Sequence, residues 1–386
     1  MKKRVRAAIL GTGFMGRVHL EAVCRLGFVD VCALATARHP DRGNSLAAEF
    51  GIEKVEPDYR RILEDRDVQV VHVCTPTALH AQIVKDALEA GKHVLSEKPL
   101  ATSVAAAREL VALANEKSLR NCTNHNLRHY PLVQHMRRLR EGDKLGEILV
   151  VQGTYSQDYL LFDTDWNWRL DSEQSGPSCA MADIGSHWCD MAEHITGRRI
   201  TELCADLKTF HPRRKRPQGW AETFGGTMLA PDQYELSAVE TEDFGAVMLR
   251  MGERARGSFT AGQVLAGRKN RLNIEIFGTK ASVAWDQERP EELWIGHRNM
   301  NNQILIKDPS LLSPNARAYA DLPGGHAEGY PDTFKNMFKR FYQAVEDPSM
   351  VPEYPQFADG LRQLTIIEAE LASNRRHGWV DVPITC

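Results

Sequence analysis

The sequence predicts an α/β protein with two domains: an amino-terminal doubly wound parallel sheet, and a carboxyl-terminal α/β domain with a large, mostly antiparallel open sheet. A chain of 386 residues is longer than one typical hydrophobic core requires. Short apolar runs alternate with helical patterns over residues 4–125, as in parallel sheets with crossover helices. Beyond that point apolar residues recur with period two. We therefore divide the chain into residues 1–125 and 126–386.

Four apolar runs, each ending at glycine, proline or polar turn residues, are the predicted strands of the first domain. A helix is predicted between two of them, because Leu79, Ile83 and Leu88 lie on one helical stripe. Gly91 then supplies a left-handed end to that helix. The strands are RVRAAIL at 4–10, DVCALAT at 30–36, VQVVHVCTP at 68–76 and KHVLSEKP at 92–99.

Alternating apolar residues and glycine turns predict the antiparallel sheet of the second domain. The segment 245–262 turns at Gly252, and the segment 271–286 turns near Gly278. Helices starting near Asp183 and covering residues 356–378 are predicted to pack on one face of this sheet. Residues 211–236 have the weakest pattern. Their basic run at 213–216 is predicted to be a solvated loop, with a clamp for an anionic substrate as the alternative.

Composition excludes several classes of protein. A formal net charge of −3 provides no field that attracts nucleic acid or an anionic membrane, so neither partner is expected. No window approaches the roughly 20 apolar residues of a spanning helix, and a cytoplasmic location is predicted. The eight cysteines form no CxxC pair and are expected to be reduced and mostly buried. Cys189 lies near His187 and Asp190, but no second pair of ligands supports a metal site, and none is predicted.

A dinucleotide-binding motif follows the first predicted strand. Gly11, Gly13 and Gly16 have the G-x-G-x-x-G spacing, directly after a strand and directly before a helix. The first glycine permits the tight turn, the second permits close approach of a pyrophosphate, and the third permits close packing of the helix on the strand. The amino terminus of the helix supplies N–H groups and a positive dipole end.

The end of the second strand bears on the choice between NAD and NADP. About twenty residues after such a motif an acidic residue would bind the ribose hydroxyls of NAD. The sequence LATARHPDRG has no carboxylate there; Thr36 and Arg38 occupy the strand end and could hold a ribose 2′-phosphate. NADP is therefore slightly favoured. The alternative is NAD with Arg38 stacked on the adenine.

Three further residues suggest catalysis. Lys98 follows a predicted parallel strand at its carboxyl end, where doubly wound sheets bind ligands. Asp183 and His187 are four residues apart, so a helix that begins at or before Asp183 presents both from one face. An acid and an imidazole together suit hydroxyl binding and proton transfer. Taken singly, the lysine could simply reach solvent, and the aspartate could be a helix cap beside a packed histidine.

Together these motifs resemble the Gfo/Idh/MocA family of sugar and cyclitol oxidoreductases over nearly the whole chain. The resemblance implies an amino-terminal Rossmann domain and a carboxyl-terminal domain whose open sheet commonly forms homodimers or homotetramers. It also implies that Lys98, Asp183 and His187 are the catalytic residues. The matching motifs are GTGFMG at 11–16, CTPTALH at 74–80, EKP at 97–99, NLRHYP at 126–131, DIGSHWCD at 183–190, FGTKAS at 277–282, GHAEGYPDTF at 325–334 and the final GW before VDVP.

The motifs and strand ends also define the candidate binding residues. The segment 157–182 varies within the family, yet its aromatic and polar residues look like a sugar subsite, with tryptophans packed at a domain interface as the alternative. The candidate cofactor-binding residues are Gly11, Gly13, Phe14, Met15, Gly16, Thr36, Arg38, Thr75, Pro76, His80, Glu97, Lys98 and Asn126. The candidate substrate-binding residues are Lys98, Arg128, Tyr155, Asp165, Trp166, Arg169, Asp183, His187 and His326.

Three functions are compatible with this sequence. The first is an NAD(P)-dependent oxidoreductase that transfers a hydride between nicotinamide and a secondary alcohol or ketone of a sugar, glycoside or cyclitol. The second is an NAD-dependent glycosidase that works by transient oxidation, elimination and re-reduction. The third is a cofactor-sensing regulatory protein on the same fold. The third is disfavoured, because a sensor has no reason to keep Lys98, Asp183 and His187 together.

Overall fold

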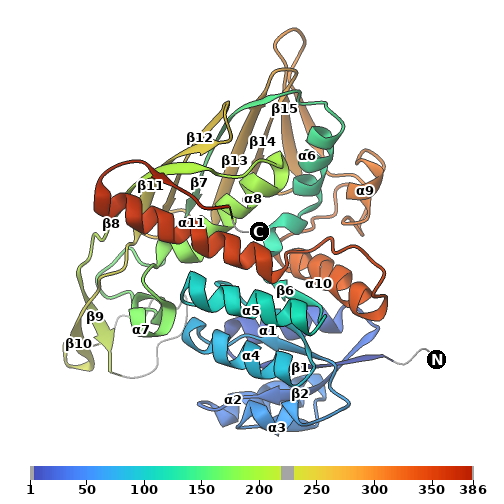
Figure 1. Ribbon diagram of the computed structural model, residues 1–386, viewed down its shortest axis with the longest axis vertical. Coiled ribbons are helices and arrows are strands. Elements are labelled where there is room, and N and C mark those ends of the chain that lie inside the picture. Colours follow the sequence, from blue (N-terminus) through green and yellow to red (C-terminus); the bar gives the residue numbers. More distant parts are fainter. Residues whose placement is uncertain (1–3, 219–229, 385–386) are drawn as a thin grey trace. The chain divides into compact units, whose positions relative to one another are not determined.

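The computed structural model describes residues 4–218 and 230–384, which form two compact units (Figure 1). The first unit contains the chain up to Asn126 together with Pro331–Leu364. The second contains Leu127–Tyr330 and the chain from Thr365 onward. The division at residue 125 did not include the return of residues 331–364 to the first unit. The sequence predicted a helix over 356–378 and assigned all of it to the second domain, whereas its residues up to Leu364 belong to the first unit.

A six-stranded parallel sheet with the order β3-β2-β1-β4-β5-β6 is the centre of the first unit. The chain moves outward from β1 in one direction and from β4 in the other, which is the predicted doubly wound topology. The carboxyl ends of β1 and β4 therefore lie at the switch point where such sheets bind ligands. The strands are β1 Val5–Leu10, β2 Val29–Ala35, β3 Lys54–Glu56, β4 Val70–Val73, β5 His93–Ser96 and β6 Asn121–Thr123.

Helices connect these strands, and the predicted crossover helix is present as α4. Its buried residues include Ile83 and Leu88, and Gly91 follows it with a φ of +73°. Leu79 is 45% exposed, because it belongs to a short 3₁₀ turn before the helix and not to the buried stripe. The helices of this unit are α1 Phe14–Cys24, α2 Pro40–Phe50, α3 Tyr59–Leu63, α4 His80–Glu89, α5 Val104–Glu116 and α10 Tyr330–Glu346.

The second unit contains the predicted large open sheet, which has nine strands in the order β16-β15-β14-β13-β7-β12-β11-β8-β17. Every neighbouring pair is antiparallel except β7 and β12. Gly252 makes the β11–β12 turn with a φ of +72°, as predicted. The strands are β7 Ile148–Ser156, β8 Glu202–Lys208, β11 Phe244–Met251, β12 Ala255–Gly262, β13 Arg271–Gly278, β14 Ser282–Asp286, β15 Glu292–Gly296, β16 Gln303–Ile306 and β17 Val380–Asp381.

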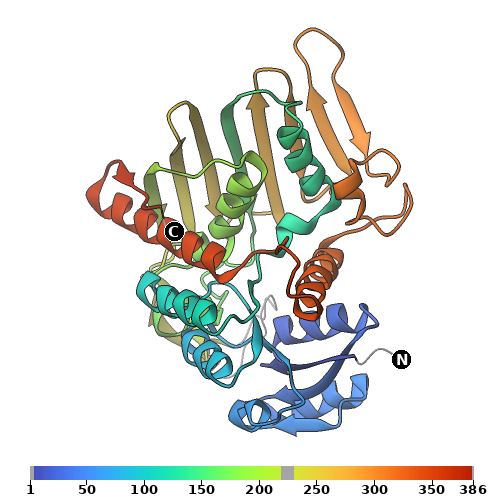
Figure 2. The same cartoon turned by 45° about the vertical axis from the view of Figure 1, so that its right-hand side comes forward.

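One face of this sheet is covered by helices (Figure 2). Trp188 of α8 shows how closely they pack: its indole N–H donates to the carbonyl of Asn273 at 3.0 Å. Gly153 of β7 lies beneath it, where a Cβ atom would be 2.7 Å from the indole nitrogen. The helices of this unit are α6 Pro131–Glu141, α7 Ser172–Ser175, a π-helix at Met181–Gly185, α8 Ser186–Thr196, α9 Pro314–Arg317 and the part of α11 (Phe357–Arg376) from Thr365 onward.

The basic run at 213–216 is a strand, so its prediction as a solvated loop is wrong. It lies in β9 (Arg213–Pro217), which pairs antiparallel with β10 (Tyr234–Ala238). Alternation along the strand turns Arg214 into the protein, where it is fully buried, and leaves Arg213 exposed. Residues 219–229 of the weakly patterned segment lie outside the described residues.

The described cysteines are free thiols, and four of them are buried: Cys74, Cys122, Cys179 and Cys189. Four of the seven described cysteines are thus buried, in agreement with the prediction of mostly buried thiols. Cys386 lies outside the described residues. Within residues 4–218 and 230–384, no helix has the length and hydropathy needed to cross a membrane. In the same ranges, no three His, Cys, Asp or Glu side chains form a group that could hold a metal ion.

Candidate functional site

The glycine motif forms the turn between β1 and α1. Gly11 has a φ of +107°, and a Cβ atom on it would lie 2.6 Å from the carbonyl oxygen of Cys74. A Cβ on Gly16 would lie 2.0 Å from the carbonyl oxygen of Gly11. A Cβ on Gly13 would have no neighbour within 4 Å. The first and third glycines are thus required by the protein itself, whereas the space at Gly13 fits a pyrophosphate that approaches the backbone.

The amino terminus of α1 is suited to the same group. Gly13 is the N-cap and provides no side-chain cap, and the positive dipole end of a helix at such a turn favours an anionic group. Phe14 is 45% exposed, and Met15 packs on the core formed by Ile9 and Leu34. The residues of this turn therefore fit a dinucleotide, with Phe14 beside it and Met15 holding the helix to the sheet.

Thr36 and Arg38 differ in how they follow β2. Thr36 is 7% exposed, and its hydroxyl accepts from Thr12 at 3.0 Å and donates to the carbonyl of His39 at 3.3 Å. Its hydrogen-bonding capacity is thus largely used within the protein. Arg38 is exposed, and no ion pair joins it to any residue of the described ranges. Of the two residues, Arg38 is the one placed for a solvent-facing anion.

His80 joins the loops that follow β4 and β5. One ring nitrogen lies 2.8 Å from the carbonyl oxygen of Thr75, and the other lies 2.7 Å from that of Pro99. Burial lowers the pKa of this imidazole, while the two carbonyls oppose that shift. Pro76 is the N-cap of the 3₁₀ turn before α4. His80 therefore ties together the two loops that follow β4 and β5.

Glu97 is 6% exposed, beside Lys98, and it ends a chain of buried hydrogen bonds. His19 Nε2 lies 2.8 Å from the Glu97 carboxylate, the Nδ1 atoms of His19 and His72 are 3.0 Å apart, and His72 Nε2 lies 2.7 Å from the hydroxyl of Tyr342. The chain is consistent if the tyrosine donates to His72, His72 to His19, and His19 to an ionised Glu97.

The titration of these groups supports that direction. Burial and the neighbouring His19 lower the pKa of His72 well below its usual value, which keeps it neutral. Burial alone would raise the pKa of Glu97, but the hydrogen bond from His19, with the charge of Lys98 and the hydrogen bond from Asn124, lowers it. Glu97 Oε2 also accepts the backbone N–H of Lys98 at 3.2 Å. Glu97 thus fixes the backbone at Lys98, and Asn126 is similarly bound to Thr333 at 2.7 Å.

In the second unit Asp183 is the centre of a polar cluster. It accepts from Arg169 Nε at 3.1 Å, from Gln263 Nε2 at 2.9 Å and from the hydroxyl of Tyr159 at 3.3 Å. Burial, with the charge of Asp183 as a second cause, raises the pKa of Tyr159 well above its usual value, so the phenol remains a donor. Arg169 and Asp183, which are both among the predicted substrate-binding residues, are thus in direct contact.

Asp183 and His187 lie on one continuous helical segment, as predicted. Asp183 is in the π-helix, and His187 is in the first turn of α8. A π-helix has more residues per turn than an α-helix and is frequent at functional sites. His187 is 7% exposed, and its ring centroid is 6.3 Å from that of Tyr155, whose hydroxyl donates to Asn270 at 2.8 Å.

Other members of the predicted substrate set are engaged within the second unit. Asp165 accepts from the N–H of Phe162 at 2.8 Å, and burial raises its pKa. Trp166 packs on Leu160 and Leu170, and the guanidinium of Arg216 lies 5.3 Å from its ring. These two side chains therefore organise their own segment.

Arg128 and His326 lie in different surroundings from Asp183. Arg128 Nε donates to Asp190 Oδ2 at 2.6 Å, and a second nitrogen donates to the other carboxylate oxygen. His326 is exposed, and its carbonyl accepts from the buried Lys307 at 2.9 Å.

The sequence analysis missed Tyr159 and Gln263 as members of the Asp183 cluster. Gln263 directly follows β12, within the unremarkable sequence AGQVLAG, and reaches Asp183 from 80 residues away. Tyr159 lies in the aromatic segment that was predicted to be a sugar subsite, so composition gave a signal for the segment but not for the residue.

The chain is similar over nearly its whole length to known dehydrogenases and oxidoreductases. Levoglucosan dehydrogenase of Pseudarthrobacter phenanthrenivorans is 29% identical over 394 residues, covering 99% of both chains. A crystal structure of levoglucosan dehydrogenase in complex with NADH and levoglucosan has a TM-score of 0.88 at 28% identity, over 99% of this chain and 100% of that one. An oxidoreductase domain protein of Kribbella flavida has a TM-score of 0.88 at 30% identity, with the same coverage.

Two family models cover most of the chain between them. Residues 5–125 match the model described as an oxidoreductase family with an NAD-binding Rossmann fold, and residues 133–284 match the GFO/IDH/MocA C-terminal domain. The glycine turn, the lysine after β5 and the Asp183–His187 helix lie within those matches. The resemblance predicted from the motifs is confirmed, and the chain belongs to the Gfo/Idh/MocA family of NAD-binding oxidoreductases.

Proposed function

We propose that this protein is an NAD(P)-dependent dehydrogenase or reductase acting on a secondary alcohol or ketone of a sugar, glycoside or cyclitol. The observation that carries the proposal is the cluster around Asp183. The Asp183 carboxylate accepts hydrogen bonds from the side chains of Arg169, Gln263 and Tyr159. Asp183 also lies one helical turn before His187. Such hydrogen-bonding groups suit a polyhydroxylated ligand, and an imidazole beside them suits proton transfer. The sugar dehydrogenase named above supports the same substrate class.

The proposed residues have different roles in this reaction. The first unit binds the dinucleotide at the turn of Gly13 and supplies Lys98, whose ammonium holds the reacting oxygen by a charge-assisted hydrogen bond. In the second unit His187 takes the hydroxyl proton during oxidation and returns it during reduction. Asp183 orients the substrate and the imidazole. The bound nicotinamide supplies the hydride acceptor or donor.

A turnover assay with a sugar panel tests this function. The purified protein is incubated with NAD⁺ or NADP⁺ and with pyranoses, glycosides, cyclitols and levoglucosan, and the absorbance of reduced nicotinamide is followed. Net reduction of the cofactor with one of these alcohols is expected. Release of an aglycone without net absorbance change would instead indicate the oxidoreductive glycosidase, and tight cofactor binding without any turnover would indicate a sensor.

The side chains after β2 favour NADP. Ala35, Thr36, Ala37 and Arg38 present no carboxylate that would repel a 2′-phosphate, and Arg38 is exposed with its guanidinium available for an anion. The structurally similar dehydrogenase was solved with NADH, so NAD is the alternative cofactor.

Replacing Arg38 with alanine is expected to weaken NADP binding by about 10-fold to 150-fold, because a charge-assisted contact contributes about 1.5–3 kcal/mol. NAD affinity stays nearly unchanged, since NAD has no phosphate at that position. Calorimetric titration of both cofactors against both proteins measures this, with Arg66→Ala as an exposed control in the same unit. Tighter NAD binding by the wild type, or equal losses for both cofactors, would contradict the assignment.

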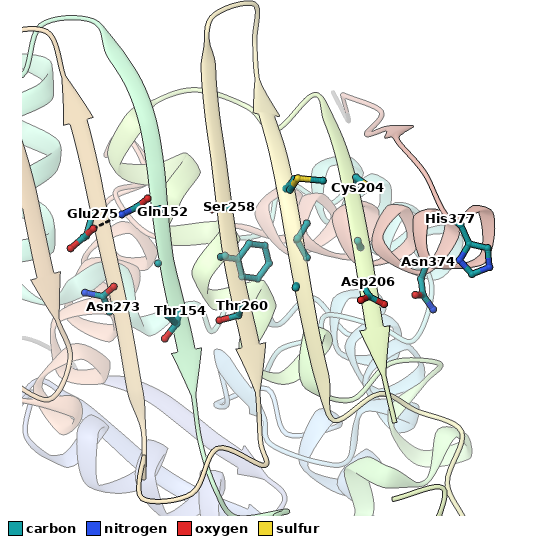
Figure 3. A pocket seen from close by; sticks show the side chains of 16 residues that line it. Gln152, Thr154, Cys204, Asp206, Ser258, Thr260, Asn273, Glu275, Asn374 and His377 are labelled. Atoms are coloured by element: carbon teal, nitrogen blue, oxygen red, sulfur yellow. Dashed lines mark hydrogen bonds between the residues drawn. The ribbon is translucent and has the colours of Figure 1, made fainter. Parts of the chain in front are cut away.

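The open face of the nine-stranded sheet is proposed to bind a second copy of this chain. The helices of the second unit lie on the opposite face. A pocket of about 750 Å³ lies on the open face, and Figure 3 shows some of the polar side chains that line it, among them Gln152, Ser258 and Asn273. Val150 and Met248 on the same face are 38% and 51% exposed. A homodimer or homotetramer would cover these apolar side chains.

Sedimentation equilibrium is expected to give at least twice the chain mass of 43.4 kDa. Replacing Met248 with glutamate places a charge at the covered face and is expected to shift the equilibrium toward monomer. Glu253→Gln, in the exposed turn after β11, is the control. A wild-type protein that sediments as a monomer, or a Met248→Glu variant of unchanged mass, would argue against this interface.

A further inference from the structure

Arg214 is a fully buried cation that donates to the backbone of one short segment and to one carboxylate. Its guanidinium donates to the carbonyl oxygens of Phe162 at 2.7 Å, Leu160 at 2.9 Å and Asp165 at 3.3 Å. It also donates to Asp243 Oδ2 at 3.2 Å. Three backbone carbonyls within six residues are thus satisfied by one side chain. An arginine with its five donors in a fixed fork can serve them together, whereas a lysine cannot.

The segment that Arg214 holds leads directly to Asp183. Tyr159 lies at one end of it and Arg169 at the other, and both donate to the carboxylate of Asp183. Between them the chain has little regular structure, with one short 3₁₀ turn at Trp168–Leu170. Backbone carbonyls in such a segment need partners from elsewhere. Arg214 supplies them, and so fixes the path of the chain between two ligands of Asp183.

The carboxylate partner of Arg214 connects to the same cluster from the other side. The carbonyl of Asp243 accepts the N–H of Gln263 at 2.9 Å, and the side chain of Gln263 donates to Asp183. The preceding residue, Glu242, accepts the N–H groups of Cys179 at 3.0 Å and Met181 at 2.9 Å, where the helical segment of Asp183 begins. The dipeptide Glu242–Asp243 therefore links the buried arginine to the helix and to the glutamine.

The rest of β9 follows the same segment. The N–H of Lys215 donates to the carbonyl of Asp163 at 2.8 Å, the Lys215 ammonium pairs with the Asp163 carboxylate at 3.0 Å, and Arg216 lies over the ring of Trp166. Arg213 is exposed and makes no ion pair with the described residues. Arg214, Lys215 and Arg216 thus brace residues 160–166, whereas Arg213 takes no part in these contacts.

We propose that Arg214 is a positioning residue that determines the affinity for the sugar. It acts through the backbone of residues 160–165, which places Tyr159 and Arg169 on Asp183, and it does not touch substrate or cofactor. The expected change in KM for the sugar rests on the proposed function. Misplacing a positioned polar group by about 1 Å can cost on the order of 10²-fold in rate. Loss of the Arg214 contacts is therefore expected to weaken sugar binding and to leave the first unit, which these contacts do not reach, unchanged.

The test compares Arg214→Lys and Arg214→Gln with the control Arg213→Gln, which changes an exposed arginine on the same strand. The Gln variant is expected to raise KM for the sugar about tenfold or more, with a smaller change in kcat. The Lys variant is expected to lie between it and wild type, since it keeps a charge opposite Asp243 but loses most carbonyl contacts. Affinity for NAD(P) is expected to stay within a few-fold in every variant.

Hydrogen exchange provides a readout that does not need turnover. The amides of Leu160 and Lys215, which donate to Gln263 and Asp163, are expected to exchange about tenfold faster in Arg214→Gln, less than that in Arg214→Lys, and at the wild-type rate in Arg213→Gln. If Arg214→Gln does not fold, Asp243→Asn keeps the side-chain shape, leaves the guanidinium without its carboxylate, and is expected to show a weaker form of the same local change.

Two results would overturn the inference. One is an unchanged KM together with unchanged exchange in residues 158–166. The other is an equal acceleration of exchange across the whole second unit, which would make Arg214 a general stabiliser of the fold. A wild-type protein that turns over no sugar would refute the proposed function, while the exchange pattern would still decide whether Arg214 braces this segment.

Discussion

Replacing Lys98 with alanine is expected to lower kcat by about 10² or more while NAD(P) affinity changes by no more than a few-fold. This is the scale expected when a positioned acid–base or charge-donating group is lost. Lys98 directly follows Glu97, whose carboxylate binds the backbone N–H of Lys98 and is itself held by His19. The protein thus fixes this short segment by buried hydrogen bonds. Removing only the ammonium leaves that framework in place, so the loss falls on the chemical step.

Steady-state kinetics with saturating cofactor and the best sugar of the panel measures this effect. Lys98→Met, which keeps the length and apolar stem of the side chain, separates loss of the charge from loss of volume. Lys85→Ala removes an exposed lysine from α4 in the same unit and is expected to change stability and turnover little. Near wild-type turnover of Lys98→Ala would remove this lysine from the mechanism.

The part of the site that could be predicted is encoded locally. Gly11, Gly13 and Gly16 are recognisable because a left-handed φ, an open approach and a close helix contact each require glycine within one turn. Lys98 was predicted because it follows the end of β5, and a parallel strand directs its carboxyl end to the ligand side. The four-residue spacing of Asp183 and His187 required only that a helix begin before Asp183, and it begins at Met181.

The remainder depends on contacts between distant segments. Gln263 is 80 residues from Asp183, and the Asp243 partner of Arg214 is 29 residues away. Charge pattern alone predicted a solvated basic loop, because charge runs are usually exposed. Arg214 is buried instead, because its guanidinium donates to three backbone carbonyls at 160–165. No sequence pattern shows that these carbonyls need a side-chain donor.

Buried polar networks were also invisible in the sequence. Glu97 and His80 were predicted to contact the cofactor, and the structure shows what else they bind: Glu97 accepts from His19, and His80 joins the carbonyls of Thr75 and Pro99. A histidine in a motif gives no sign of which atoms face its two nitrogens. The pairing of β4 with β5 brings the loops after these strands together, and so places the carbonyls of Thr75 and Pro99 within reach of one imidazole.

Replacing His187 with alanine is expected to lower kcat for sugar oxidation by about 10² or more, because the hydroxyl then has no positioned base. His187 is 7% exposed, one helical turn after Asp183, so the imidazole is held in place and shielded from bulk solvent. In the wild type, the rate of oxidation is expected to fall as the pH is lowered, since a protonated base cannot accept the proton. In His187→Ala that dependence on low pH is expected to flatten, with the remaining rate limited by hydroxide or water.

Profiles of kcat/KM against pH for both proteins measure this change, and calorimetry checks that NAD(P) still binds. His187→Gln retains hydrogen bonding without basicity, so it is expected to recover KM for the sugar but not kcat, whereas Ala loses both. His297→Ala, in the turn between β15 and β16, removes another histidine from the second unit and should leave the profile unchanged. If His187→Gln instead keeps the wild-type kcat and pH dependence, the proton is handled by another group. Lys98 would be the first to test, because an amine is the other base in the proposed set.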